Sequence, residues 1–342
     1  FNTLQGGSNV DTFNLNANVT GTVNGGAGDD RFNLLEGVTI GTLDGGTGGE
    51  TNGDTLAAVD DTPLTPSANT WTIGVSNSVD QGGTTQAFAG MENLQGDASA
   101  DTFTVNTGGT ITTLNGGGDN DTFTFTGGTA TNANGEAGND TFTLNGGAIA
   151  NIDGGAQTTA DVLQGTTGND TFTLNGGVAI AGVTTIAGIE TVDGRTGDDT
   201  FNVTGATTVN LAGGADNDTF TVDAALTGTI DGGTQTTAAG DVLQGTQITA
   251  VTLTGQSAGE FAGNEADVTG GFSNINTING TAGTLTGLNA ASTWDIDGTP
   301  TYTSGGSTLA FSGFNTLQGG SNVDAFTVNT GGTITTLNGG GD

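Results

Sequence analysis

The sequence of 342 residues contains no cysteine, no histidine and no lysine, and its only basic side chains are Arg31 and Arg195. Without cysteine, no disulfide can stabilise the chain, so redox chemistry says nothing about its compartment. Against the two bases stand 36 acidic residues, giving a formal net charge of −34. Because almost nothing basic is available to meet phosphate, the composition argues against nucleic acid and anionic membranes as partners.

Long apolar runs are also missing. No stretch approaches the length of a membrane span, and no signal peptide is recognisable, so we expect no membrane insertion. Aromatic residues make up only 6% of the chain, a composition that also occurs in disordered proteins. The regular recurrence of Phe and Leu argues against disorder.

What the sequence has in abundance is glycine, with 66 residues, and one repeated unit. The unit begins with an aliphatic or small residue, continues through a glycine loop to Asp, and reaches Phe at the ninth position after its start. From the Phe onward, apolar and polar residues alternate, which predicts a half-buried strand ended by a Gly or Asn-Gly turn. The nine pairs are Leu4 and Phe13, Val23 and Phe32, Leu94 and Phe103, Leu114 and Phe123, Ala133 and Phe142, Leu163 and Phe172, Val192 and Phe201, Leu211 and Phe220, and Leu317 and Phe326.

The unit recurs with a short, nearly constant period, as the successive loop aspartates Asp101, Asp121 and Asp140 show. Two strands and two turns in about 20 residues leave no room for a crossover helix, and a fixed period of this kind indicates a repeat architecture. The sequence therefore predicts an all-β, right-handed parallel β-solenoid of the β-roll or β-helix kind, with coils of about 19–20 residues and the Phe side chains inside.

A second, longer repeat lies over the first. The segment from Trp71 to Gly96 aligns with that from Trp294 to Gly319 at a constant offset of 223, and Val105–Gly118 recurs unchanged as Val328–Gly341. The irregular stretches leave three interpretations open: wider coils, a different strand count, or a small side domain. We expect regular coils in 1–56, irregular or wider coils in 57–93, regular coils in 94–245, irregular or wider coils in 246–313 as the partner of 57–93, and the start of the next regular block in 314–342.

Both chain ends fall inside repeats, Phe1 within a coil and Asp342 within a loop. We expect the repeats to continue in a longer chain, or copies to stack end to end, because the strand edges at the ends of a solenoid template association. The expected partner is therefore the same kind of chain.

Residues 25–33 match the repeated unit Gly-Gly-x-Gly-x-Asp-x-apolar-x, and Asp161 and Asp170 are separated by the length of that unit. These loops resemble the repeats-in-toxin (RTX) β-roll, and the remainder resembles the Gly/Thr/Asn-rich strand repeats of bacterial cell-surface, adhesin-like proteins. The β-roll resemblance implies Ca²⁺ bound by the Asp side chains and loop carbonyls. The implied calcium ligands are Asp11, Asp30, Asp101, Asp121, Asp140, Asp170, Asp199, Asp218 and Asp324.

The loops also depart from that family, which has two such loops in each turn where most coils here have one. The alternative is that each Asp closes its turn by accepting backbone N–H bonds. Carboxylates stacked ~5 Å apart would repel by roughly 3 kcal/mol per pair at an effective dielectric of 20. A bound cation would remove that cost, and both interpretations stay open at this point.

The expected function is a structural or adhesive repeat region of an extracellular bacterial surface filament or giant surface protein, stabilised by Ca²⁺, with surface glycans as a further partner. We expect no catalysis, because nearly every Asp belongs to the repeat. One alternative is a carbohydrate-active enzyme of the β-helix kind, with paired carboxylates. The other is an ice- or surface-binding solenoid that uses its Thr-x-Thr ladders.

Overall fold

The computed structural model describes residues 2–60, 67–155, 160–235 and 240–341. Within these ranges the chain forms β-strands, and no helix is long and apolar enough to cross a membrane. Phe1, Pro63, Pro66, Asp342 and the centres of two longer loops, 156–159 and 236–239, lie outside the described residues. The chain divides into two compact units, Phe1–Gln164 with Gly182–Ile189, and Gly165–Ala181 with Glu190–Asp342.

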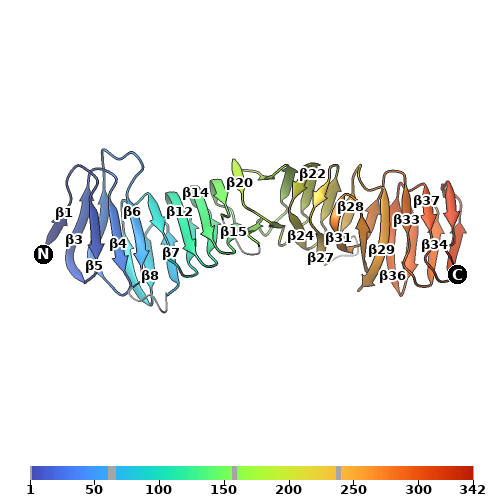
Figure 1. The fold of residues 1–342 in the computed structure, drawn as a ribbon, viewed down its shortest axis with the longest axis horizontal. Helices are drawn as coiled ribbons and strands as arrows, with labels where there is room; N and C mark the ends of the chain where they lie inside the picture. The colour runs from blue at the N-terminus through green and yellow to red at the C-terminus, as the bar shows by residue number, and fades with distance from the viewer. Residues whose placement is uncertain (1, 61–66, 156–159, 236–239, 342) are drawn as a thin grey trace. The chain divides into compact units, whose positions relative to one another are not determined.

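Strands of the first unit lie side by side, blue to green in Figure 1. The strands are β1 (Thr3–Gln5), β2 (Thr12–Leu15), β3 (Val19–Gly26), β4 (Arg31–Leu35), β5 (Ile40–Gly46), β6 (Thr55–Val59), β7 (Asn69–Ile73), β8 (Asn77–Gln81), β9 (Thr84–Phe88), β10 (Asn93–Gln95), β11 (Thr102–Asn106), β12 (Thr110–Gly118), β13 (Thr122–Thr126), β14 (Thr129–Ala137), β15 (Thr141–Leu144), β16 (Ala148–Asp153), β17 (Val162–Gln164) and β20 (Thr185–Ala187).

Most strands of this unit pair in parallel with the strand one repeat away. Eight of them follow the order β2-β4-β6-β10-β12-β14-β16-β20, and β1, β3 and β5 form a separate row. In a further row, β11 pairs with β13 and β13 with β15, so that Phe103, Phe123 and Phe142 occupy equivalent positions. An all-β fold with parallel pairing at the period of the repeat is thus confirmed.

Side chains alternate between core and solvent along each strand, as the period-two pattern predicts. The rings of Phe103, Phe123 and Phe142 stack nearly parallel, with centroids 5.0 and 4.8 Å apart. Of the nine Phe residues predicted to face inward, eight are buried. The ninth, Phe326, is half-buried and stacks on Trp294.

Residues 69–88 interrupt the parallel pairing in the first unit. Strands β7, β8 and β9 form an antiparallel meander, in which Trp71 pairs with Val79. On one side β7 pairs in parallel with β11, and on the other Ala89 bridges Asp44 at β5. The meander fills the row between β5 and β11. The sheets therefore contain both parallel and antiparallel pairs, which corrects the expectation of purely parallel strands. Where no glycine-loop repeat is present, short turns join strands that are neighbours in the sequence, and such strands pair antiparallel.

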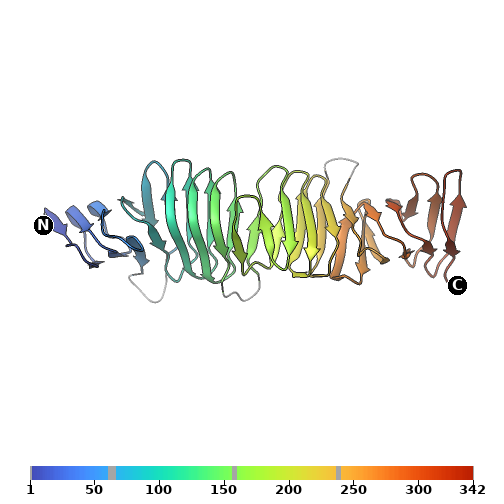
Figure 2. The same cartoon turned by 90° about the horizontal axis from the view of Figure 1, so that it is seen from above.

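Strands of the second unit also lie side by side, most clearly in Figure 2. The strands are β18 (Thr171–Asn175), β19 (Val178–Ile180), β21 (Thr191–Asp193), β22 (Thr200–Gly205), β23 (Thr207–Thr208), β24 (Asn210–Ala215), β25 (Thr219–Val222), β26 (Leu226–Thr227), β27 (Ile230–Thr234), β28 (Val242–Gln244), β29 (Ala250–Ser257), β30 (Glu260–Glu265), β31 (Val268–Ile275), β32 (Thr277–Asn279), β33 (Thr284–Thr286), β34 (Ser292–Ile296), β35 (Thr301–Ser304), β36 (Ser307–Ser312), β37 (Thr316–Gln318), β38 (Asp324–Val328) and β39 (Thr336–Asn338).

The second unit repeats the same construction. Parallel pairs join β18 to β22, β22 to β25 and β25 to β28, and antiparallel meanders occupy 250–275 and 292–312. The meander β34-β35-β36 corresponds to β7-β8-β9 at the offset of 223 seen in the sequence. Trp71 stacks on Phe103 of β11, and Trp294 stacks on Phe326 of β38. The longer repeat seen in the sequence is thus also a structural repeat.

Candidate functional site

The predicted ligand aspartates lie immediately before strands, and most are joined by hydrogen bonds from one repeat to the next. In the first unit, the N–H of Asp101 donates to Asp121 Oδ1 at 2.6 Å, and the N–H of Asp121 donates to Asp140 Oδ1 at 2.7 Å. Asp11 donates to Asp30 in the same way at 2.8 Å. In the second unit the bonds run from Asp170 to Asp199 at 2.7 Å and from Asp199 to Asp218 at 2.8 Å.

We call this arrangement the aspartate seam. It is defined by the side chains whose Oδ1 accepts a backbone N–H from the residue one repeat earlier. Six of the nine predicted residues are seam acceptors, and Asp11 and Asp170 each donate to the first acceptor of their run. Asp324 differs because its Oδ1 accepts from the hydroxyl of Ser292. The seam acceptors are Asp30, Asp54, Asp101, Asp121, Asp140, Asp161, Asp199, Asp218 and Asp241.

Sequence reasoning missed three of these acceptors, Asp54, Asp161 and Asp241. Each is followed at the second position by Leu in place of Phe, so the search for Asp before Phe passed over them. The signal was nevertheless present, because Asp161-Val-Leu and Asp241-Val-Leu both follow a Gly-Gly loop. A pattern of Asp, any residue, then any large apolar residue would have found all three.

The second carboxylate oxygen of most seam residues has no hydrogen-bond partner. Oδ2 is buried and unpartnered in Asp30, Asp54, Asp121, Asp140, Asp199, Asp218 and also in Asp324. In each of these loops, Oδ2 lies beside the first glycine of the loop. At Gly116, for example, an added Cβ would overlap Asp121 Oδ2 and would lie 2.7 Å from the carbonyl oxygen of Gly135. Glycine is therefore required there, and one carboxylate oxygen and one backbone carbonyl border the space.

Burial changes the acidity of the seam. Desolvation raises the pKa of Asp121 to about 8, and the neighbouring charges of Asp101 and Asp140 add to the rise, whereas the hydrogen bond from the Asp101 N–H opposes it. Desolvation is also the main reason why the pKa of Asp101, Asp199 and Asp218 rises to about 7.

The calcium prediction can be compared with this donor set. Ca²⁺ takes six to eight oxygen ligands at about 2.3–2.6 Å. In the seam, Oδ1 already accepts a backbone N–H, and at Gly116 and Gly213 the space beside Oδ2 is bordered by one backbone carbonyl oxygen. Among the residues that the structure describes, no three acidic side chains come close enough to hold a metal ion together. The donor set of the seam therefore falls short of a calcium shell.

A second ladder runs along the loops just outside the seam, in the opposite direction. It uses the residue before the seam Asp. The N–H of Asn139 donates back to Asn120 Oδ1 at 2.7 Å, and the N–H of Asn217 donates back to Asp198 Oδ1 at 3.0 Å. The recurrent Asn-Asp-Thr sequence thus supplies one acceptor to each neighbouring repeat, and each loop is held from both sides.

Outward threonines form two straight rows on four neighbouring strands of the first unit. Register pairing aligns Thr102 with Thr122, and Thr104 with Thr124, and the same alignment extends to β7 and β15. Most of these side chains are half-exposed, and Thr143 is covered because its hydroxyl donates to Gln164. The eight members are Thr70, Thr72, Thr102, Thr104, Thr122, Thr124, Thr141 and Thr143.

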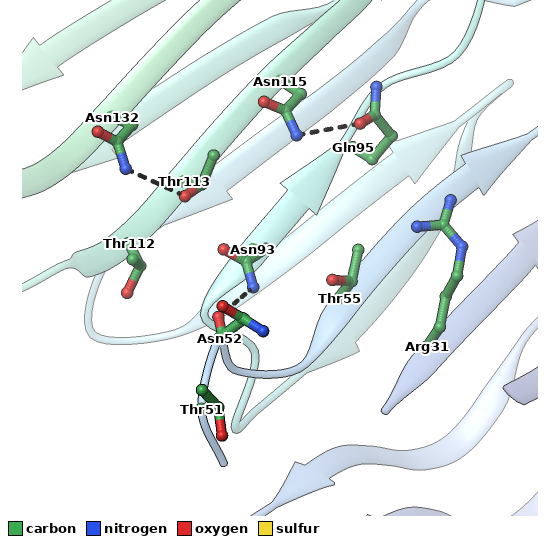
Figure 3. Close-up of a pocket in the computed structure, with 10 residues that line it drawn as sticks. All are labelled: Arg31, Thr51, Asn52, Thr55, Asn93, Gln95, Thr112, Thr113, Asn115 and Asn132. Atoms are coloured by element: carbon green, nitrogen blue, oxygen red, sulfur yellow. Dashed lines mark hydrogen bonds between the residues drawn. The ribbon is translucent and has the colours of Figure 1, made fainter. Parts of the chain in front are cut away.

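A shallow polar groove crosses the outer face of β4, β6, β10, β12 and β14 (Figure 3). Within it, Asn115 Nδ2 donates to Gln95 Oε1 at 3.0 Å. The described lining residues include Arg31, one of only two bases, and no acidic residue, but two carboxylates bond to the lining: Glu136 accepts from Gln95 Nε2 at 3.1 Å, and Asp29 accepts from the N–H of Thr51 at 2.7 Å. The lining residues are Arg31, Thr51, Asn52, Thr55, Asn93, Gln95, Thr112, Thr113, Asn115 and Asn132.

No protein-family model matches the chain, and no curated protein matches it either.

Proposed function

We propose that the chain is a structural repeat region of an extracellular bacterial surface filament or giant surface protein, built as a right-handed parallel β-solenoid with one repeat in each coil. The observation that carries the proposal is the register. Phe103, Phe123 and Phe142 in one unit, and Phe172, Phe201 and Phe220 in the other, pair at equivalent positions in successive strands. Such a repeat is stabilised mainly by its neighbours, so length can be added by adding repeats.

The partner in this proposal is more of the same repeat, in a second copy or in the same chain. A repeat surface that fits one neighbour fits another of similar sequence, and residues 105–118 recur unchanged at 328–341. The net charge of −34 opposes lateral clumping but leaves pairing along the strand-stacking direction possible.

Electron microscopy of the native material tests the proposal. Thin filaments, or extended fibres projecting from a cell surface, are the expected result. Compact particles of about the 33.3 kDa chain mass would contradict it.

Adhesion, in this proposal, would use the polar groove. Its amides and hydroxyls can exchange hydrogen bonds with the hydroxyls of a glycan. Saturation-transfer NMR with surface glycans should detect contact that Arg31→Ala and Asn93→Ala reduce. Asn202→Ala, on a half-exposed strand position of the second unit, is the control and should leave the signal unchanged.

The threonine rows favour a second candidate, binding to ice or another regular surface. Their hydroxyls repeat about every 4.8 Å between strands and about 7 Å along each strand, which is a regular lattice. Thermal hysteresis measures this activity directly. A signal lost in the double variant Thr104→Leu with Thr124→Leu, but kept in Thr173→Leu with Thr221→Leu, would support it, and no hysteresis in the unaltered protein would end it.

A further inference from the structure

We propose that the aspartate seam is a structural hydrogen-bonded seam that needs only one acceptor oxygen per repeat, so that asparagine can replace aspartate, and that calcium does not occupy it. The β-roll resemblance implies the opposite role for the same side chains. Three observations in the described residues carry the proposal.

The first observation is the unequal use of the two carboxylate oxygens. Oδ1 of Asp121, Asp140 and Asp218 accepts a backbone N–H at 2.6, 2.7 and 2.8 Å, in that order. Oδ1 of Asp199 does the same at 2.7 Å. Oδ2 of these four residues is buried without a partner. Burying a charged oxygen without a hydrogen bond costs free energy. The seam is therefore stabilised by the hydrogen bonds that Oδ1 accepts, and the negative charge does not stabilise it.

The second observation is an amide at a seam position of this chain. Asn276 follows Asp241 by one repeat, because Val242 and Thr277 are register partners. The N–H of Asp241 donates to Asn276 Oδ1 at 2.9 Å, as it would to an aspartate. Backbone pairing continues there too, since the N–H of Asn276 donates to the Asp241 carbonyl at 3.0 Å.

The third observation is what surrounds Oδ2. Beside Asp218, a Cβ on Gly213 would overlap Oδ2 and would lie 2.6 Å from the Gly232 carbonyl oxygen. A carboxylate oxygen and a carbonyl oxygen are both acceptors and cannot bond to each other. An amide nitrogen in the place of Oδ2 would put a hydrogen-bond donor beside that carbonyl in place of a second acceptor, which favours asparagine at this position.

The experiment compares variants in the second unit. Asp199→Asn with Asp218→Asn keeps both Oδ1 acceptors, whereas Asp199→Ala with Asp218→Ala removes them. Asp198→Asn is the charge control, because it removes one exposed carboxylate from the outer ladder, where Asn169 and Asn217 occupy equivalent positions. The melting temperature of each variant is measured at pH 8, with millimolar CaCl₂ and with excess EDTA.

The proposal predicts that the double asparagine variant melts at or above the temperature of the unaltered protein, and that the double alanine variant melts several degrees lower. It also predicts that calcium leaves the melting temperature unchanged, or raises it equally in the unaltered protein and the asparagine variant. Two results would overturn it: an asparagine variant as unstable as the alanine variant, or a calcium-induced rise that the asparagine changes abolish. If the alanine variant does not fold, calcium titration of the other two proteins still decides.

Discussion

The regular run β11–β16 and the meander β7–β9 are neighbours in the first unit, but they are built in opposite ways. In the regular run, each strand pairs with the equivalent strand of the next repeat, and the intervening loop is held by seam and outer-ladder hydrogen bonds. In the meander, each strand pairs with the next in sequence through a short turn, such as Gly82-Gly83, where both residues have positive φ.

The two regions share an aromatic core and differ in the seam. Trp71 of the meander stacks on Phe103 of the regular run at 5.7 Å, almost as the Phe rings stack on one another. Within the described part of the meander, Asn69 is the residue that contacts the seam, by donating to Asp101. The core therefore continues where the seam stops. The seam hydrogen bonds occur in the glycine-loop repeats, whereas apolar stacking stabilises both the parallel strands of the regular run and the antiparallel strands of the meander.

The largest expected effect comes from breaking the core on both sides of this comparison. Phe123→Ala removes a buried ring that stacks on two others and should cost about 4 kcal/mol of unfolding free energy. Phe88→Ala, in the meander, removes a ring with one aromatic neighbour and should cost about 3 kcal/mol. Urea denaturation measures both, and a larger loss from Phe88→Ala would show that the ladder is not the stronger part of the core.

A glycine of the seam should be far less replaceable than one in the meander. Gly116→Ala places a methyl group against Asp121 Oδ2 and the Gly135 carbonyl and should cost about 3 kcal/mol. Gly74→Ala, at the end of β7, meets nothing closer than 3.5 Å and should change stability by less than about 0.5 kcal/mol. Equal losses in thermal unfolding would mean that the seam is not tightly packed.

Stability should depend on pH through the regular run. The pKa of Asp101 and Asp121 is raised to about 7 and about 8, above the value of 3.8 expected in the unfolded chain. The folded protein therefore holds protons that the unfolded chain has lost, so their contribution is fully present below about pH 4 and is lost as pH rises through 7 to 8.

The melting temperature should accordingly fall by several degrees between pH 4 and pH 9. Asp121→Asn should flatten part of that slope, because it removes the carboxyl whose pKa is raised to about 8. A protein that becomes more stable as pH rises over this range would contradict the raised pKa of the buried seam residues.

The smallest effects should come from outward polar side chains. Asn132→Ala removes an amide that accepts from Asn151 at 2.9 Å and should cost about 0.5 kcal/mol. Thr85→Ala in the meander, which breaks one exposed bond to Asp80, should cost no more. A loss above about 2 kcal/mol at Asn132 would make the outer amide row a main source of stability.

Much of the regular architecture follows from local patterns in the sequence. The constant interval before each Phe and the alternation after it predicted regular strands and nine inward Phe rings, of which eight are buried, because period-two burial and glycine turns are local properties. The position of Asp before each strand was also visible. The meanders were not, since antiparallel neighbours in sequence lack the period of the repeat, and Trp71 stacks on the distant Phe103.

The seam itself could not be derived from spacing. Whether Asp121 coordinates an ion or accepts a backbone N–H depends on which oxygen faces the neighbouring repeat, and that is a property of the stacked strands. Asn276 can be identified as the counterpart of a seam aspartate only from its register with Asp241, which the sequence does not give. Sequence reasoning placed the residues, and three-dimensional pairing assigned their hydrogen bonds.

The stacking of repeats is tested most directly by measuring which outward threonines are neighbours. Because the chain lacks cysteine, Thr102→Cys with Thr122→Cys places the only two thiols on adjacent strands, ~4.8 Å apart. Thr70→Cys with Thr122→Cys places them two strands apart, on either side of Thr102. Stacking in this register predicts rapid cross-linking of the first pair, and little of the second, by a reagent that spans about 5 Å. Equal yields, or preferential cross-linking of Thr70→Cys with Thr122→Cys, would contradict it.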